Sequence, residues 1–270
     1  MEFQNYATLS PAVKAQVCRV KEVWLRLLGG DVAGVYLHGS VALGRFVEGV
    51  SDIDMLVVTQ RRMSRDERLA AAREMIDIDG QPASLEMSAV WRGHLWPWRH
   101  PTPCQFHYSS AWTDRYRLML SGAIAEHFLL DQDFEDPDIA CHGELTRQSG
   151  ICVYGEPASG VFPPVPPQDF WQSIAQDVET YSFHAYEPRC LPSNILVLAR
   201  ILSYKQLGRV LSKYDAGLWV LERLPERCRP VVHSALSAWY NKEEMAAYSP
   251  EQLEELRQFL LGEILGKDRG

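Results

Sequence analysis

Two aspartates separated by one residue, Asp52 and Asp54, follow a glycine–serine pair, Gly39–Ser40, and open an apolar run. Residues two apart on a β-strand point to the same side, so the two carboxylates are expected to share one face. Parallel carboxylates repel each other unless a cation lies between them, and their hard oxygen atoms suit Mg2+ with water and phosphates. A small-residue pair before a short helix offers backbone N–H groups to phosphate. The spacing therefore predicts a site for a Mg2+–nucleoside triphosphate.

A third carboxylate, Glu86, is the only charged group in the apolar stretch 83–91. Leu85 and Met87 alternate with Glu86 and Ser88, which is strand periodicity. A glutamate on an edge strand could simply point into water. Beside the aspartate pair, it is better explained as a general base or as a third carboxylate on the metal side. An isolated Asp-x-Asp is common in surface loops, but here it begins a β-branched run in which unpaired carboxylates are costly.

The glycine–serine pair, the spacer and the Asp-hydrophobic-Asp motif resemble the signature of the DNA polymerase beta superfamily of nucleotidyltransferases. From about Val35 to the last helix, the chain also resembles the streptomycin/spectinomycin adenylyltransferases of antibiotic resistance. The blocks that carry this second resemblance are Leu85-Glu86-Met87, Trp96-Pro97-Trp98-Arg99-His100-Pro101, Gln105-Phe106-His107-Tyr108, Asn194 to Arg200, Ser212 to Ala216, Trp219, Glu222-Arg223-Leu224-Pro225 and Tyr240.

This resemblance implies transfer of AMP from ATP to a hydroxyl group of a cationic aminoglycoside or aminocyclitol. It implies that Asp52 and Asp54 hold Mg2+ and that Glu86 is the catalytic base. The positions that match nucleotide-binding residues of the family are Gly39, Ser40, Ser51, Asp138, Arg200, Lys213 and Tyr240. The positions assigned to acceptor binding are Glu86, Trp112 and Glu187.

Simpler interpretations stay open for several of these residues. Ser51 also suits a turn before the strand, and Asp138 suits the first turn of a helix, where a carboxylate complements the helix dipole. Lys213 could be a solvated lysine at a helix start, and Tyr240 could be a core tyrosine. Arg200 lies in an apolar helical pattern, where an unpaired charge is costly, so an anionic partner is expected.

The chain departs from the streptomycin-modifying members in segment 181–192. Tyr181 or Ser182 stands where those members have tryptophan, and Leu191 stands in place of one acidic residue. Trp112 lies one residue later than the family tryptophan, and the spacer before the aspartate pair is one residue longer. These departures favour spectinomycin over streptomycin. The alternatives are a protein or non-antibiotic acceptor, or a non-catalytic nucleotide-binding module, against which the three retained carboxylates argue.

Composition agrees with a cytoplasmic enzyme. The chain has 270 residues, a formal net charge of −8 and six scattered cysteines without a Cys-x-x-Cys pair, which indicates reduced thiols and no zinc site. No apolar run approaches the roughly 20 residues that span a bilayer, so no membrane association is expected. The negative charge disfavours nucleic acid as a partner and suits a cationic small substrate. We expect a monomer.

The secondary-structure pattern predicts an α/β (α+β) nucleotidyltransferase domain with a mixed sheet, followed by an all-α helical bundle. The first domain is expected at residues 1–157 and the second at 168–270, with the active site between them. The proline-rich linker 158–167 is expected to form neither a helix nor a central strand.

Elements are expected from caps and periodicity along the first domain. The predicted strands are 32–37, 53–58 and 83–91, and the predicted helices are 11–28, a short one near residue 40, 64–78, 110–130 and 137–150. In the second domain Asn194 is expected to cap a helix that ends at Gly208.

Overall fold

The computed structural model describes residues 4–124, 128–180 and 190–266. The chain forms two compact units, Glu2–Ser173 and Ile174–Gly270. The first unit is built on a mixed five-stranded sheet and the second is helical, which confirms the predicted fold class. None of the described helices is both long enough and apolar enough to cross a lipid bilayer.

The large sheet has the strand order β5-β3-β2-β1-β7. Its strands are β1 Val32–Leu37, β2 Ile53–Thr59, β3 Leu85–Trp91, β5 Phe106–Ser109 and β7 Ile151–Gly155. The β2–β3 pair is parallel and the other pairs are antiparallel. A separate two-stranded sheet pairs β4, Thr102–Cys104, with β6, Phe134–Asp136.

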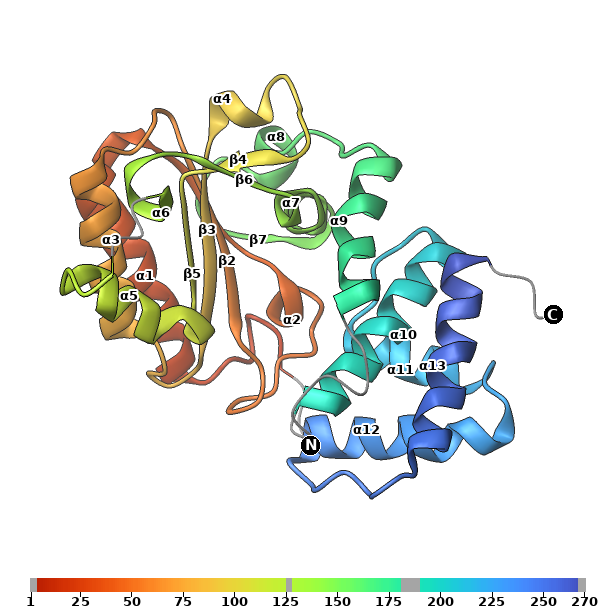
Figure 1. Cartoon of the computed structure of the whole chain (residues 1–270). Helices are drawn as coiled ribbons and strands as arrows, with labels where there is room; N and C mark the ends of the chain where they lie inside the picture. Colours follow the sequence, from red (N-terminus) through yellow and green to blue (C-terminus); the bar gives the residue numbers. More distant parts are fainter. Residues whose placement is uncertain (1–3, 125–127, 181–189, 267–270) are drawn as a thin grey trace. The chain divides into compact units, whose positions relative to one another are not determined.

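Helices α1 (Pro11–Leu28) and α3 (Arg65–Ile78) cover one face of the large sheet (Figure 1). The hydroxyl of Ser10 accepts a hydrogen bond from Val13 N–H at 3.3 Å and caps α1. Ser64 and Glu67 form a capping box at the start of α3, the helix predicted over 64–78. The side chains that point from the sheet towards these helices are buried and include Ile53, Met55, Val57, Met87 and Ala89.

The opposite face of the sheet packs against α7 (Asp138–Ser149) and α8 (Ala158–Val161). Because side chains alternate along a strand, this second face carries Leu56 and Val58 from β2 and Val90 from β3. The remaining elements of the unit are short: η1 Gly29–Asp31, α2 Gly39–Ala42, α4 Arg92–Leu95, η2 Ser110–Trp112, α5 Thr113–Leu120 and α6 Phe128–Asp131.

The prediction that the proline-rich stretch contains no helix was wrong. Pro157 precedes the one-turn helix α8, and a proline at that position removes no hydrogen bond from the helix. Val161 and Phe162 are buried, and the Phe162 ring meets Tyr36 edge-on at 5.3 Å. The next helix, α9 (Pro167–Thr180), begins with a proline in its first turn and runs from the first unit into the second.

Two predicted helices also have different bounds. The helix expected over 110–130 ends at Leu120, where Gly122 takes a positive φ of 77°. The helix expected from Asn194 begins three residues earlier, at Leu191, because Pro192 suits the first helical turn. Asn194 is therefore buried inside the helix and is not its cap.

The helical unit contains α10 (Leu191–Leu207), which packs against three further helices. These are α11 Lys213–Leu221, α12 Arg229–Asn241 and α13 Pro250–Leu265, with the short turn η4 Glu226–Cys228 before α12. Ser249 and Gln252 form a capping box at the start of α13.

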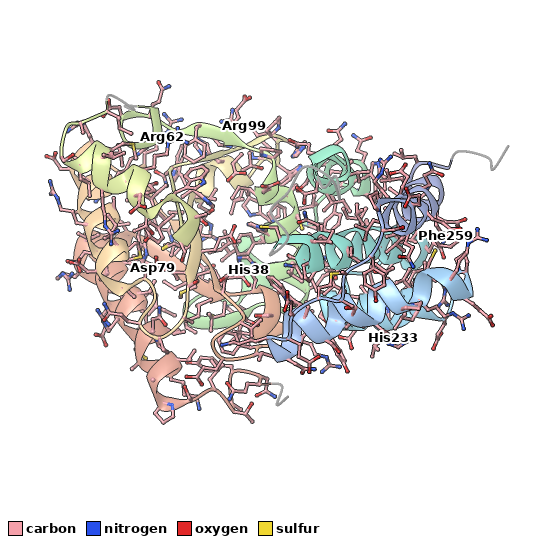
Figure 2. All side chains as sticks on the ribbon, turned by 60° about the horizontal axis from the view of Figure 1, so that its bottom comes forward. His38, Arg62, Asp79, Arg99, His233 and Phe259 are labelled. Carbon is pink, nitrogen blue, oxygen red and sulfur yellow. The ribbon has the colours of Figure 1, made fainter. Side chains whose placement is uncertain are left out.

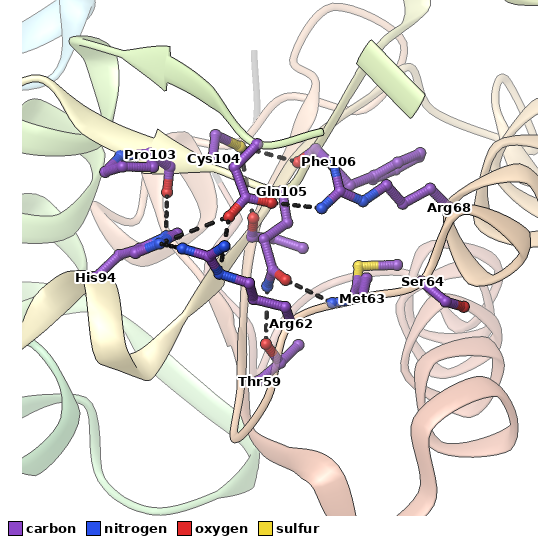
Figure 3. A network of polar contacts seen from close by, with 12 residues as sticks. Thr59, Arg62, Met63, Ser64, Arg68, His94, Pro103, Cys104, Gln105 and Phe106 are labelled. Carbon is purple, nitrogen blue, oxygen red and sulfur yellow. Dashed lines mark hydrogen bonds and ion pairs between the residues drawn. The ribbon is translucent and has the colours of Figure 1, made fainter. Parts of the chain in front are cut away.

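A buried polar network lies where β2 ends (Figure 3). Arg68 and Arg62 pair with Asp133, and Gln105 donates to Thr59 Oγ1 at 2.8 Å. Nδ1 of His94 donates to the carbonyl of Pro103 at 3.1 Å, since a carbonyl can only accept. These contacts fix the loop after β2 and lie at the opposite end of that strand from the aspartate pair.

Candidate active site

Asp54 and Glu86 lie directly opposite each other on the neighbouring parallel strands β2 and β3. Both side chains are half-buried. They share the sheet face of Leu56 and Val90, which is the face covered by α7, because strand side chains alternate. The structure thus brings together the second aspartate and the glutamate, which are 32 positions apart in the chain.

The Gly39 backbone lies against the Asp54 carboxylate. Gly39 opens α2 with a positive φ of 58°, and a Cβ atom at this position would overlap Asp54 Oδ2. The preceding His38 N–H donates to the Asp54 carbonyl at 3.0 Å. Only glycine fits this turn, for both conformational and steric reasons. The predicted phosphate-binding turn and the predicted metal ligand are therefore in direct contact.

Ser40 and Ser51 have different surroundings. Ser40 Oγ is buried and has no hydrogen-bond partner within the described part of the chain. Ser51 Oγ accepts from Val47 N–H at 3.0 Å, and Ser51 N–H donates to the Val47 carbonyl at 2.8 Å. Ser51 thus closes a turn, as the simpler interpretation expected. That turn leads to Asp52, which is exposed and lies just before β2.

Three histidines surround these carboxylates and were missed in the sequence. His107 lies on β5 and its Nδ1 is 2.9 Å from Ser88 Oγ, while Ser88 is two residues after Glu86 on β3. The rings of His38 and His142 are 4.9 Å apart, which links α7 to the start of α2. Burial lowers the pKa of His38 and of His107, which favours the neutral form of both imidazoles.

Trp112 lies beside this row of polar residues. Its ring contacts the His107 ring edge-on, at 5.0 Å between centroids, and the guanidinium of Arg115 lies 5.5 Å from its centroid. The pairing of Glu86 with Ser109 brings η2, which carries Trp112, next to β3. The predicted base and the predicted acceptor-binding tryptophan thus belong to one cluster.

Asp138 is the first residue of α7, and its N–H donates to Asp136 Oδ1 at 2.9 Å. Burial raises the pKa of Asp136. His142 lies one helical turn further along α7, at i+4, and therefore on the same side of the helix as Asp138. Through the contact of His142 with His38, this side of α7 faces the Gly39 turn.

The predicted residues of the helical unit are considered within that unit. Lys213 begins α11; its Nζ donates to Ser193 Oγ at 2.9 Å and lies 4.6 Å from the centroid of Trp239. Tyr240 is buried, as expected for a core tyrosine, and its ring meets Tyr214 edge-on. Arg200 is half-buried in α10. Glu187 lies outside the described residues.

The donor set of this site suits Mg2+. Within residues 4–124, 128–180 and 190–266, no group of three or more His, Cys, Asp and Glu side chains is arranged to hold a metal. Mg2+ does not need such a group, because it is usually bound by one or two carboxylates together with substrate phosphates and water. Asp54, placed against the Gly39 turn, meets this requirement with Asp52 as its partner.

Comparison with known proteins agrees with this arrangement. The nucleotidyltransferase domain family matches residues 17–109, and the family described as the C-terminal domain of aminoglycoside adenylyltransferase matches residues 160–263. An aminoglycoside (3'') (9) adenylyltransferase of Klebsiella pneumoniae is 26% identical over 258 residues, covering 93% of this chain and 95% of the relative. A spectinomycin 9-adenylyltransferase of Campylobacter jejuni is 26% identical over 260 residues, covering 89% and 95%.

A solved structure has the same fold. It is a spectinomycin adenyltransferase from Enterococcus faecialis with ATP and spectinomycin, at a TM-score of 0.78 and 19% identity, covering 93% of this chain and 99% of that one. Both domain families occur here in order, and the relatives align over nearly their whole length. The chain is therefore an enzyme of the aminoglycoside adenylyltransferase family of nucleotidyltransferases.

Proposed function

We propose that this enzyme transfers AMP from ATP to a hydroxyl group of an aminoglycoside or aminocyclitol in a Mg2+-dependent reaction, and that it prefers spectinomycin to streptomycin. The observation that carries the proposal is the contact between the Gly39 turn and Asp54, with Glu86 opposite Asp54 on the next strand. The acceptor class comes from the activities for which the two relatives are named.

Nucleotide binding begins at the Gly39 turn. The backbone N–H groups of Gly39 and Ser40 bind phosphate, and the buried Ser40 hydroxyl gains the hydrogen-bond partner that the described chain does not provide. From the family resemblance, Ser51 and Asp138 contribute further nucleotide contacts in the first unit. Arg200, Lys213 and Tyr240 do so from the helical unit, where two cations suit the triphosphate.

Asp52 and Asp54 would hold the Mg2+ ion. When bound, the ion offsets negative charge on the attacking and leaving oxygens. Asp54 is kept in place by the glycine turn on one side and by the paired strand on the other. This rigid support is what a positioned carboxylate ligand requires.

Glu86 acts as the general base. It accepts the proton of the acceptor hydroxyl, whose oxygen then attacks the α-phosphorus while the bond to pyrophosphate breaks. Its place opposite Asp54 sets the base beside the metal ligand. Positioning and fixed charges supply most of the rate enhancement in such a transfer.

The preference for spectinomycin rests on the sequence departures at the acceptor positions. Leu191 stands where the streptomycin-modifying members have an acidic residue, and Trp112 lies one position later in the chain than the tryptophan of the family. Loss of an acidic partner weakens binding of a guanidinium-bearing acceptor more than that of a smaller aminocyclitol. Trp112 and Glu187 are the residues proposed to contact the acceptor together with Glu86.

The test is pyrophosphate release from Mg-ATP with spectinomycin, with streptomycin and without an acceptor, for the wild type and Glu86→Gln. We expect turnover with spectinomycin that exceeds turnover with streptomycin and is lost in the variant. Turnover that survives Glu86→Gln contradicts the assignment of the base. ATP binding without turnover on either drug contradicts the proposed acceptors and favours a protein or another small molecule as the acceptor.

A further inference from the structure

The Asp79 carboxylate, just after α3, accepts four hydrogen bonds from groups on two strands and two helices. Asp79 is labelled in Figure 2. Oδ1 accepts from Leu85 N–H at 3.0 Å and from the Ser110 hydroxyl. Oδ2 accepts from the Tyr108 hydroxyl at 3.0 Å and from the Thr113 hydroxyl at 3.1 Å. All four donors are uncharged groups.

Ser110 completes the connection between β3 and η2. Its Oγ also accepts from Leu85 N–H at 3.0 Å and lies 3.3 Å from the Leu85 carbonyl. Leu85 is the residue before Glu86, and Ser110 opens the one-turn helix that ends at Trp112. Asp79 and Ser110 therefore join the backbone next to the proposed base to the turn that carries the proposed acceptor contact.

The loop after α3 is already anchored without these bonds. Gln16 on α1 donates to the Ile78 carbonyl at 3.1 Å and to the Ala83 carbonyl at 2.7 Å. It also accepts from Ala83 N–H at 3.0 Å. Because Gln16 fixes this loop to α1, the bonds of Asp79 add a different constraint, which is the placement of β3 relative to η2.

We propose that Asp79, acting through Ser110, is a positioning residue that sets the separation of Glu86 and Trp112 and thereby aligns the acceptor with the base. The inference rests on the proposed function, because it takes Glu86 as the base and Trp112 as an acceptor contact. A displacement of about 1 Å in such an arrangement lowers turnover by up to about 100-fold.

The experiment compares Asp79→Ala, Ser110→Ala and Ser110→Thr in the full-length enzyme with spectinomycin as the acceptor. We expect Asp79→Ala and Ser110→Ala to lower kcat and to raise the KM for spectinomycin, each by about tenfold, with the KM for ATP unchanged. Ser110→Thr keeps the hydroxyl, so we expect its kcat and its KM for spectinomycin to match those of the wild type. Equal changes in the two KM values, or no change in any, overturn the inference.

Ser64→Ala is the matched control for lost stability. It removes the cap at the other end of α3 and touches neither Glu86 nor Trp112. We expect it to lower the melting temperature as Ser110→Ala does and to leave kcat and both KM values unchanged. A Ser64→Ala enzyme with the same kinetic defect as Ser110→Ala shows that the defect is a general loss of stability.

A second readout does not depend on turnover. In 5-fluorotryptophan-labelled protein, the 19F resonance of Trp112 is assigned by its loss in Trp112→Phe. We expect this resonance to shift in Asp79→Ala and Ser110→Ala but not in Ser64→Ala. An unchanged Trp112 resonance in both variants overturns the positioning role even if the wild type is inactive on every acceptor tried. If the wild type is inactive on every acceptor but the Trp112 resonance shifts in Asp79→Ala and Ser110→Ala, the result contradicts the proposed function and leaves the positioning role standing.

Discussion

A Cβ atom on Gly39 would occupy the space that Oδ2 of Asp54 fills. The glycine is required at this position for its positive φ and also for this contact. The turn proposed to bind phosphate and the carboxylate proposed to bind metal are therefore coupled through a few atoms, so a change in one displaces the other.

Gly39→Ala separates activity from stability. The methyl group displaces the Asp54 carboxylate, and we expect kcat/KM to fall by about 100-fold or more. The positive φ alone costs about 1 kcal/mol of folding free energy. Gly122→Ala is the control, since Gly122 also has a positive φ and a Cβ there meets nothing within 4 Å. Equal activity of the two variants in a turnover assay contradicts the coupling of Gly39 to Asp54.

Asp54→Asn is expected to weaken the response to Mg2+. The amide supplies a neutral oxygen in place of a charged one, so the Mg2+ concentration for half-maximal turnover rises by at least about tenfold. Chelation with EDTA abolishes turnover of the wild type. Asp31→Asn is the control, because Asp31 pairs with Arg61 on the surface. A Mg2+ titration that is the same for Asp54→Asn and the wild type removes Asp54 as a ligand.

His94 makes folding stability sensitive to acid. Burial lowers the pKa of His94, which donates from Nδ1 to Pro103 and accepts at Nε2 from Arg62 at 3.2 Å. Below about pH 6.5 the unfolded chain binds a proton that the folded chain excludes, so the free energy of unfolding falls as the pH decreases towards the lowered pKa.

We expect His94→Asn, which keeps a donor for the Pro103 carbonyl, to make this dependence less steep in urea unfolding between pH 5 and 7.5. Part of the slope should remain, because burial also lowers the pKa of His38 and of His107. His233→Asn serves as the control, because His233 is exposed. If the slope of unfolding free energy against pH is the same in His94→Asn as in the wild type, His94 is not a source of the acid sensitivity.

Phe162 tests whether the proline-rich stretch contributes to the core. Its side chain is 1% exposed and packs against Tyr36. Phe162→Ala is expected to lower the free energy of unfolding by about 3–5 kcal/mol, measured by urea denaturation. Tyr154→Ala, at a side chain that is 38% exposed on β7, should cost much less. A small effect of Phe162→Ala would mean that this stretch packs loosely.

Local signals were enough to predict several elements. Ser10 with Pro11, and Ser64 with Glu67, are helix starts that act through the first turn alone, so α1 and α3 were predicted correctly. Strand β1 was also predicted with its observed bounds, because its apolar run has clear ends. The helix α8 was missed because prolines dominate the composition of the stretch 157–167. These prolines lie before and after the helical turn and not within it, so they do not prevent it.

Contacts between distant segments could not be predicted in the same way. The opposition of Asp54 and Glu86 depends on the register of a parallel pair joined through α3, which no local pattern specifies. The histidine cluster depends on the same pairing and on α7. One signal was available in the sequence. Ser88 is two residues after Glu86 and therefore on the same face of β3, where a second polar residue is unusual for a buried strand. His107 lies opposite Ser88 on β5.

The parallel pairing of β2 and β3 limits how this gene can change in length. A change of one residue that shifts β3 by one position against β2 would turn Glu86 to the face packed by α1 and α3 and would send Met87 to the face of Asp54. Two codons together would restore the facing. Length changes that shift β3 should therefore be tolerated only in pairs of residues, a parity imposed by the pleat of the strand.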